Sequence, residues 1–188
     1  MNMPAFSRMP FSSQAVWPSL HHIDSRVKRA FWSIVVPMSL LPPAMVFVAG
    51  EQHGSVFLPS AIVSDWGYIA AIFFFCELVS VALMGWLVKE VASSWNSRVT
   101  FGQAYLLAAI SPIPLWFSSL GLLVPSLAFN AVLSIAALVV SCGLVFQGVR
   151  GLCKISEELE AAMITQIVFG AGMLVWGVLL LLLVVLPG

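Results

Sequence analysis

Five long apolar segments constrain the fold of this chain more than any other feature. They occupy approximately residues 30–50, 66–88, 101–124, 127–149 and 160–186. A helix needs about 20 predominantly apolar residues, each rising about 1.5 Å, to cross a hydrocarbon core about 30 Å thick. The sequence therefore predicts an all-α polytopic membrane protein, folded as a bundle of five transmembrane helices.

The composition leaves little room for a second folded domain. The 188 residues are 61% hydrophobic and 9% charged, whereas a soluble domain is about 45–50% apolar and about 25% charged. We divide the chain into a cytoplasmic N-terminal segment, residues 1–29, and a five-helix transmembrane domain, residues 30–188. The first segment has a loose helical spacing of apolar residues that could rest on the membrane surface. It lacks the apolar run of a signal peptide, so we expect no cleaved leader.

Prolines interrupt two of the five segments. The first contains Pro37, Pro42 and Pro43, and the third contains Pro112 and Pro114 in "SPIP". A proline inside a helix removes a backbone hydrogen bond and clashes with the preceding turn, so the first and third helices should be kinked. The break in the third helix either exposes carbonyl groups to an ion or substrate or is a kink that serves packing.

All eight basic residues fall on one side of the five-span topology. They precede the first span, follow the second, or lie between the fourth and fifth: Arg8, Arg26, Lys28, Arg29, Lys89, Arg98, Arg150 and Lys154. Lys and Arg are enriched in cytoplasmic loops. We therefore expect the N-terminus in the cytoplasm and the C-terminus outside.

A single carboxylate, Glu77, lies in the middle of the second span, with no other charge between Asp65 and Lys89. An ionisable group at this depth costs at least about 2.5 kcal/mol and is a candidate functional site. Helical spacing places Ser80 and Gly85 on its face, which should therefore meet another helix.

Three explanations of Glu77 remain open. It donates a hydrogen bond to a neighbouring helix, it contacts a partner subunit, or it is a proton or ion transport site. The partners expected for the hydrogen bond are Asn130, Ser134, Ser141 or a carbonyl freed by Pro112. The candidate binding residues are Glu77, Ser80, Pro112, Pro114 and Asn130.

No catalytic, metal or cofactor motif is present. The chain contains no HExxH, GxSxG or P-loop pattern, and its three cysteines have no CxxC or Cys/His spacing. A formal net charge of zero gives no indication of a nucleic-acid partner. We expect no enzymatic activity, no metal, no cofactor and no nucleic-acid binding.

Two local patterns stand out: "LLAAISPIPL" in the third span and "FQGV", Phe146 to Val149, at the entry to the link before the last span. Together with the five-span topology, they resemble the bacterial branch of the Yip family. The likeness covers most of residues 30–188. The chain departs from the pattern with Phe146 where Tyr is usual and Arg150 where Pro is common. The eukaryotic relatives are Golgi and endoplasmic-reticulum membrane proteins that interact with Rab GTPases, and the resemblance implies a multi-pass protein of the bacterial inner membrane.

These features favour a non-enzymatic integral membrane protein that acts as a binding, scaffolding or assembly component. Its expected partners are membrane lipids and other membrane proteins, which it would contact through its transmembrane helices. One alternative is an accessory subunit of a larger membrane complex. The other is a small transport or permeation protein that uses Glu77 and the broken third helix.

Overall fold

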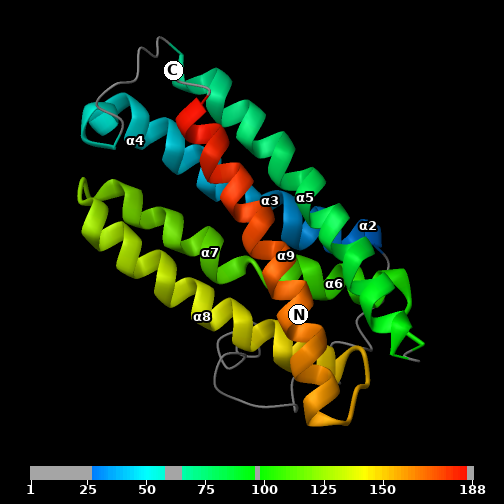
Figure 1. Ribbon diagram of the computed structural model, residues 1–188. Helices are drawn as coiled ribbons and strands as arrows, with labels where there is room; N and C mark the ends of the chain where they lie inside the picture. The colour runs from blue at the N-terminus through cyan, green and yellow to red at the C-terminus, as the bar shows by residue number, and fades with distance from the viewer. Residues whose placement is uncertain (1–26, 58–64, 96–97, 186–188) are drawn as a thin grey trace.

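The computed structural model describes residues 27–57, 65–95 and 98–185, and this part of the chain is all-helical (Figure 1). Five helical segments are long and apolar enough to cross a membrane. The predicted fold class is therefore confirmed. The spans comprise, in order, α2 (Val27–Ala30), η2 (Phe31–Val35), α3 (Val36–Ser39) and α4 (Leu41–Phe57); α5 (Trp66–Ser94); α6 (Phe101–Ile110), α7 (Ile113–Ser118) and η3 (Ser119–Leu123); α8 (Leu127–Gly151); and α9 (Glu158–Val185).

The kinks predicted from proline are present in the first span. It begins with one α-helical turn, continues as the π-helical segment η2, and is interrupted again at Leu40 before α4. Pro37 stands in the first turn of α3, where its missing N–H matters least. A further kink lies at His53, whose φ of −138° and ψ of 20° are not helical.

The third span breaks at Ser111 and Pro112, as predicted. The segment α6 ends at Ile110 and α7 begins at Ile113. The two halves pack against different neighbours, because α6 lies mainly against α5 and α7 lies mainly against α8. The break therefore divides the span into two separately placed pieces.

Polar residues fix the starts of three helices. The Asp65 carboxylate accepts a hydrogen bond from the backbone N–H of Tyr68 at 3.1 Å and so caps α5. Thr100 and Gln103 form a capping box at the start of α6. Ser126 caps α8, directly after the short turn from the third span. These caps satisfy backbone N–H groups that have no partner within the helix.

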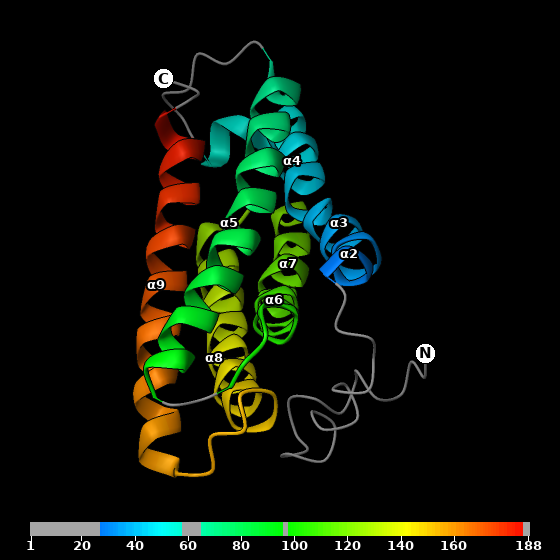
Figure 2. The same ribbon diagram turned by 90° about the vertical axis from the view of Figure 1, so that its right-hand side faces the viewer.

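The spans form a ring. Helix α4 packs against α5, α5 against α9, α9 against α8, α8 against α7 and η3, and η3 returns to α4. Figure 2 shows α9 running the length of the bundle beside α5 and α8. One end of the ring is filled by α6 and by a core of buried side chains from the end of α5, the end of α8 and the start of α9.

A close backbone approach locks α5 to α6 at the filled end. A Cβ added to Gly85 would lie 3.1 Å from the Cα of Tyr105. Contacts this short are tighter than ordinary packing, so a side chain at position 85 would require the two helices to shift slightly apart. The Tyr105 side chain is itself buried in the core.

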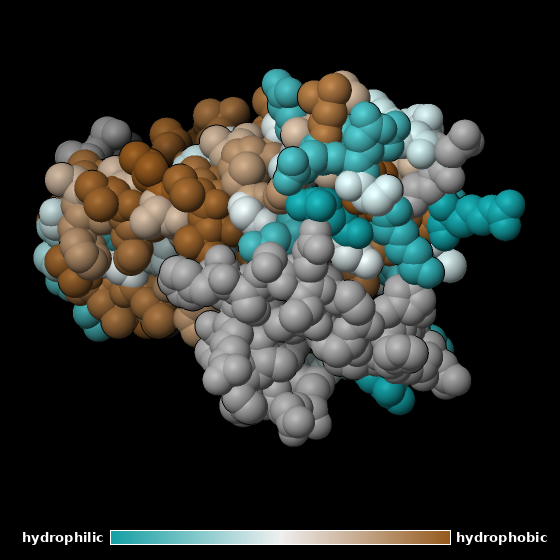
Figure 3. Space-filling view, turned by 90° about the horizontal axis from the view of Figure 1, so that it is seen from below, coloured by the Kyte–Doolittle hydropathy of each residue, from teal (hydrophilic) through white to brown (hydrophobic). Residues whose placement is uncertain are grey.

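The described basic residues lie at the filled end of the bundle. They occupy the start of α2, the end of α5, the chain just before α6, and the end of α8 with its following link. Figure 3 shows the same segregation on one face, where hydrophilic residues gather mostly at one end and hydrophobic residues predominate toward the other. This distribution matches the one-sided arrangement of charge in the sequence.

Candidate functional site

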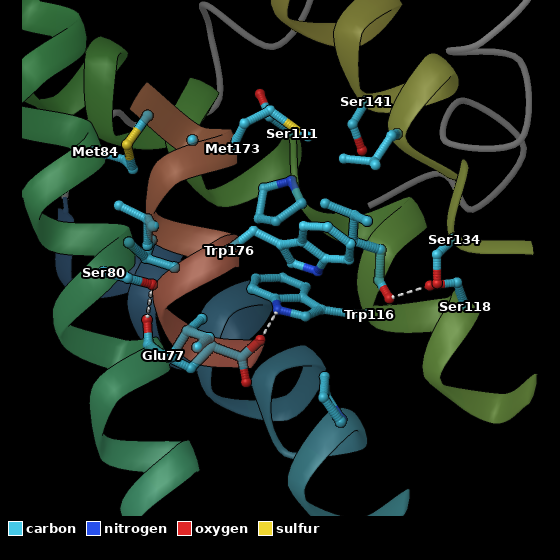
Figure 4. A pocket seen from close by; sticks show the side chains of 18 of the residues that line it. Glu77, Ser80, Met84, Ser111, Trp116, Ser118, Ser134, Ser141, Met173 and Trp176 are labelled. Carbon is cyan, nitrogen blue, oxygen red and sulfur yellow. Dashed lines mark hydrogen bonds between the residues drawn. The ribbon is translucent and has the colours of Figure 1, made fainter. Parts of the chain in front are cut away.

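The ring lines a partly open cavity of about 260 Å³. Every span contributes to its wall, as Figure 4 shows for a selection of the side chains. Most of the lining is apolar. The polar groups include Glu77 and Ser80 from α5, Ser111 and Trp116 from the third span, Asn130, Ser134 and Ser141 from α8, and Trp176 from α9. An engineered cavity of about 150 Å³ holds benzene, so a space of this size can hold a small organic molecule.

Glu77 is the one acidic residue among the described side chains of this wall. Its side chain is only 6% exposed, and its Oε1 accepts a hydrogen bond from the indole Nε1–H of Trp116 (Figure 4). The other oxygen, Oε2, is buried and has no hydrogen-bond partner in the described part of the chain. A buried acceptor without a partner costs about 1–3 kcal/mol, and more when it is charged.

A second buried polar atom without a partner lines the same cavity. Ser141 is 3% exposed, and its Oγ forms no hydrogen bond within the described residues. Buried hydroxyl groups in native proteins are nearly always bonded to protein or to water. Glu77 and Ser141 thus mark the cavity as a place where polar groups lack the partners that they need.

Other hydroxyl groups of the wall donate to their own helices. Ser80 donates to the carbonyl oxygen of Glu77 at 2.7 Å, and Ser111 donates to that of Leu107 at 2.7 Å. Ser118 donates to the carbonyl oxygen of Leu115 at 2.8 Å. A hydroxyl group has one proton and two acceptor lone pairs. These oxygens can therefore still accept a hydrogen bond.

The predicted binding residues are only partly brought together. Glu77, Ser80, Pro112 and Asn130 line the cavity, whereas Pro114 is not among the described residues that form its wall. The hydrogen-bond partners expected for Glu77 were wrong, because Trp116 donates to it instead. Asn130 is engaged locally, since its Nδ2 donates to the carbonyl oxygens of Val124 and Ser126.

Trp116 and Trp176 are the cavity residues that the sequence analysis missed. The clue for Trp116 was its position, four residues after Pro112 in the interrupted third span. A tryptophan in a membrane span is usually assigned to the interface, yet Trp116 is buried and its N–H points inward. Within the described residues, no group of three His, Cys, Asp or Glu side chains could hold a metal ion.

The fold and the cavity define a five-span helical membrane protein with a polar group at the centre of its interior. The model of the Yip1 domain matches residues 9–179, and the chain therefore belongs to the Yip1 domain family. This match starts well before residue 30, so the family likeness reaches further into the N-terminal segment than expected. No curated protein and no solved structure matches the chain.

The two positions at which the sequence departs from the expected Yip pattern lie in contact. The guanidinium carbon of Arg150 lies 5.7 Å from the centroid of the Phe146 ring, one helical turn earlier in α8. Arg150 also forms an ion pair with Glu158 at the start of α9, at 3.4 Å. Cation–π contacts favour an aromatic ring beside a guanidinium group. The two departures are thus structurally coupled.

Proposed function

We propose that this Yip1-family protein is a non-enzymatic binding component of the membrane, and that it binds a small amphipathic molecule in the cavity beside Glu77. The carboxyl oxygen Oε2 of this cavity-lining residue, which is buried and has no partner in the described part of the chain, carries this proposal. A ligand that supplies the missing hydrogen bond would remove the cost of leaving that oxygen unsatisfied. A mainly apolar wall with a few polar groups is typical of small-molecule sites.

The hydrogen bond from Trp116 supports a binding role more than a purely structural one. It joins two spans but satisfies only one of the two carboxyl oxygens. A proton relay needs a series of ionisable groups, and Glu77 is the one acidic residue among the described side chains that line the cavity. These features favour binding over transport.

Ligand-induced stabilisation tests the binding function. Purified protein in phosphatidylcholine nanodiscs would be heated with a series of decyl amphiphiles, which share one alkyl chain and carry different head groups. A ligand at about 100 times its Kd stabilises the native state by about 2.7 kcal/mol. We expect at least one amphiphile to raise the unfolding temperature of the wild type.

The matched variants separate the cavity from the lipid-facing surface. Ser134→Leu places an apolar side chain in the cavity and should abolish the effect of the amphiphile. Leu174→Phe changes a residue of α9 that is 74% exposed and should leave the effect intact. Equal responses of Ser134→Leu and the wild type would reject binding in this cavity.

A second candidate role, assembly with another membrane protein, is favoured by the outward face of α9. Exposed residues follow a spacing of four and three along this face: Met163, Ile167, Gly170, Leu174, Gly177, Leu181 and Val184. This is the spacing of the contact positions in left-handed helix pairs. Lipid accounts for exposed Leu and Val, but a Cβ added at Gly170 or Gly177 meets nothing within 4 Å. Small residues at such positions let a partner helix approach closely.

Disulfide cross-linking in native membranes tests this role. A single cysteine at Leu174 should form a covalent dimer on oxidation if two copies pair through α9. The control is a single cysteine at Val132, an equally lipid-facing position of α8. Cross-linking of similar yield at the two positions would indicate random collision and would reject the α9 contact.

The location of the protein also belongs to this proposal. The one-sided distribution of Lys and Arg supports a cytoplasmic N-terminus and an external C-terminus. The resemblance to the bacterial Yip branch supports the bacterial inner membrane.

A further inference from the structure

We propose that the ligand of the cavity is an alkylammonium ion, that is, a primary ammonium group on an apolar chain, and that Glu77 binds the ammonium group. This inference rests on the proposed binding function and adds the chemical class of the ligand. It follows from the hydrogen-bonding capacity of the wall, its charge and its size.

The polar groups of the wall are mainly acceptors. The hydroxyl protons of Ser80, Ser111 and Ser118 and the indole proton of Trp116 are already donated within the protein. The amide protons of Asn130 are directed to backbone carbonyl groups. What remains is Oε2 of Glu77, the lone pairs of the serine oxygens, and two further donors of the wall, the Ser141 hydroxyl and the Trp176 indole N–H. A ligand that complements such a wall is rich in donors, and a primary ammonium group has three donors and no acceptor.

The distribution of ionisable residues in the wall also favours an ammonium ligand. Glu77 lines the cavity, and none of the described side chains that accompany it there is Lys, Arg or His. A buried carboxylate is stabilised by an opposite charge that also forms a hydrogen bond with it. A cationic ligand supplies this charge. A carboxylate or phosphate ligand would instead meet Glu77 with no basic partner.

The geometry allows the contact. The Oε2 atom is buried, but the terminal torsion of a glutamate side chain is soft and broadly two-fold. A rotation of the carboxyl group would turn an oxygen toward the cavity, and the hydrogen bond from Trp116 would be exchanged for the bond to the ligand. The apolar chain would then lie along Val81, Met84 and Met173, which line the same space.

The volume limits the size of the ligand. The cavity of about 260 Å³ is just below the about 300 Å³ at which sites for drug-sized molecules begin. It fits the ammonium group and part of one alkyl chain. A phosphatidylethanolamine headgroup carries the same ammonium but brings a phosphate, for which the described side chains of the wall offer no basic partner. A free amine is the better fit of the two sources.

The test compares head groups on one chain length. Wild-type protein in phosphatidylcholine nanodiscs would be titrated with decylammonium, decyltrimethylammonium, decanol and decanoate, with the unfolding temperature and tryptophan fluorescence as readouts. We expect decylammonium to bind about tenfold more tightly than decanol, because a charge-assisted hydrogen bond is stronger than a neutral one. Decyltrimethylammonium keeps the charge but has no N–H donor, so it should lose most of this preference.

Two variants assign the preference to Glu77. In Glu77→Gln the carboxylate is lost with little change of shape, and decylammonium and decanol should bind within about twofold of each other. The matched control is Glu90→Gln, at an exposed glutamate near the end of the same helix that forms an ion pair with Lys89. It should keep the wild-type preference. The comparison of head groups on the wild type remains decisive even if Glu77→Gln does not fold.

The outcomes separate this inference from the binding function. Equal affinity of the wild type for decylammonium and decanol would overturn the ammonium assignment and leave the binding function standing. An unchanged preference of Glu77→Gln for decylammonium over decanol would also overturn the ammonium assignment. If none of the four amphiphiles binds, both proposals are rejected.

The source of the ammonium is tested in the same assay. Replacing part of the phosphatidylcholine with phosphatidylethanolamine should not weaken the binding of decylammonium. Competition by phosphatidylethanolamine would overturn the assignment to a free amine and identify a lipid headgroup as the occupant.

Discussion

The indole Nε1–H of Trp116 donates a hydrogen bond to Oε1 of Glu77 and joins the second span to the third across the interior of the bundle. The two residues stand 39 positions apart in the sequence. Both side chains are buried, so water does not compete for this bond. The bond holds the carboxyl group at the cavity wall, where its second oxygen is left without a partner.

A double-mutant cycle should measure the coupling between these two residues. Trp116→Phe removes the donor, Glu77→Leu removes the acceptor, and the double variant removes both. Hydrogen bonds between membrane helices contribute about 0.6 kcal/mol on average and about 1.7 kcal/mol at most. We expect a coupling energy in this range, measured by reversible unfolding in mixed micelles. Strictly additive effects of the two substitutions would mean that the hydrogen bond does not stabilise the native state.

Replacing Gly85 by a larger residue should destabilise the protein. Gly85→Ala forces the new Cβ against the Tyr105 backbone, and overpacking of this kind costs about 1–3 kcal/mol. The control is Gly143→Ala in α8, where an added Cβ meets nothing within 4 Å. Such a change should be neutral or stabilise the protein by about 0.4–1 kcal/mol. The measurement is the free energy of unfolding, and equal effects of the two variants would contradict the close approach of α5 and α6.

Cys153 should be unreactive in the folded protein. It lies in the link between α8 and α9, is 2% exposed, and its burial raises the pKa of the thiol from the ordinary value of 9.0 to about 12. The thiolate is the reactive form, and this rise lowers its fraction at pH 8 by about a thousandfold. In a variant that retains Cys153 alone, iodoacetamide should react with the unfolded protein but hardly with the native one. An engineered Ser94→Cys thiol at the exposed end of α5 serves as the reactive control.

The same thiol should make the fold sensitive to alkali. The pKa of Cys153 is raised in the folded state, so its neutral form is favoured there and its contribution to stability is complete below pH 9. This contribution is lost as the pH rises from about 9 toward 12, because the unfolded chain ionises first. Cys153→Ala should therefore lose less stability than the wild type between pH 8 and about pH 10. A parallel loss in both proteins would exclude Cys153 as the cause.

The orientation of the protein can be measured with a reporter fused after Gly188. Because all eight Lys and Arg residues lie on one side of the five-span topology, we expect a fused alkaline phosphatase to be active outside the cytoplasm. A reporter fused before Met1 should show cytoplasmic behaviour. Cytoplasmic activity of the C-terminal fusion would overturn the proposed orientation.

The spans and their interruptions were predictable because each depends on local sequence. Length and hydrophobicity identify a span wherever it packs, and Pro37 and Pro112 disturb a helix in any surroundings. The interior face of α5 was predictable for a similar reason. Phe73, Glu77 and Gly85 are all buried, as the helical spacing around Glu77 indicates.

The partner of Glu77 was not predictable, because it depends on how two distant helices rotate about their axes. The expected partners were chosen for their polar side chains, and Asn130 was among them. Its amide instead bonds to backbone carbonyl groups of the turn before α8. Trp116 was overlooked because indole counts as apolar in most of its contacts, although its N–H is a hydrogen-bond donor. The cavity itself has no signature in the sequence, since it arises from the gaps between five spans.

The divided third span gives its two halves unequal freedom. The half before Ser111 is fixed to α5 by the close approach at Gly85 and lies within the buried core. The half after Pro112 carries Trp116 and rests mainly on α8 and α4. It follows that a shift of the indole would be passed to α8 and α4 more directly than to α6. In mechanical terms, the half before Ser111 would serve as the fixed part of the third span and the half after Pro112 as its movable part.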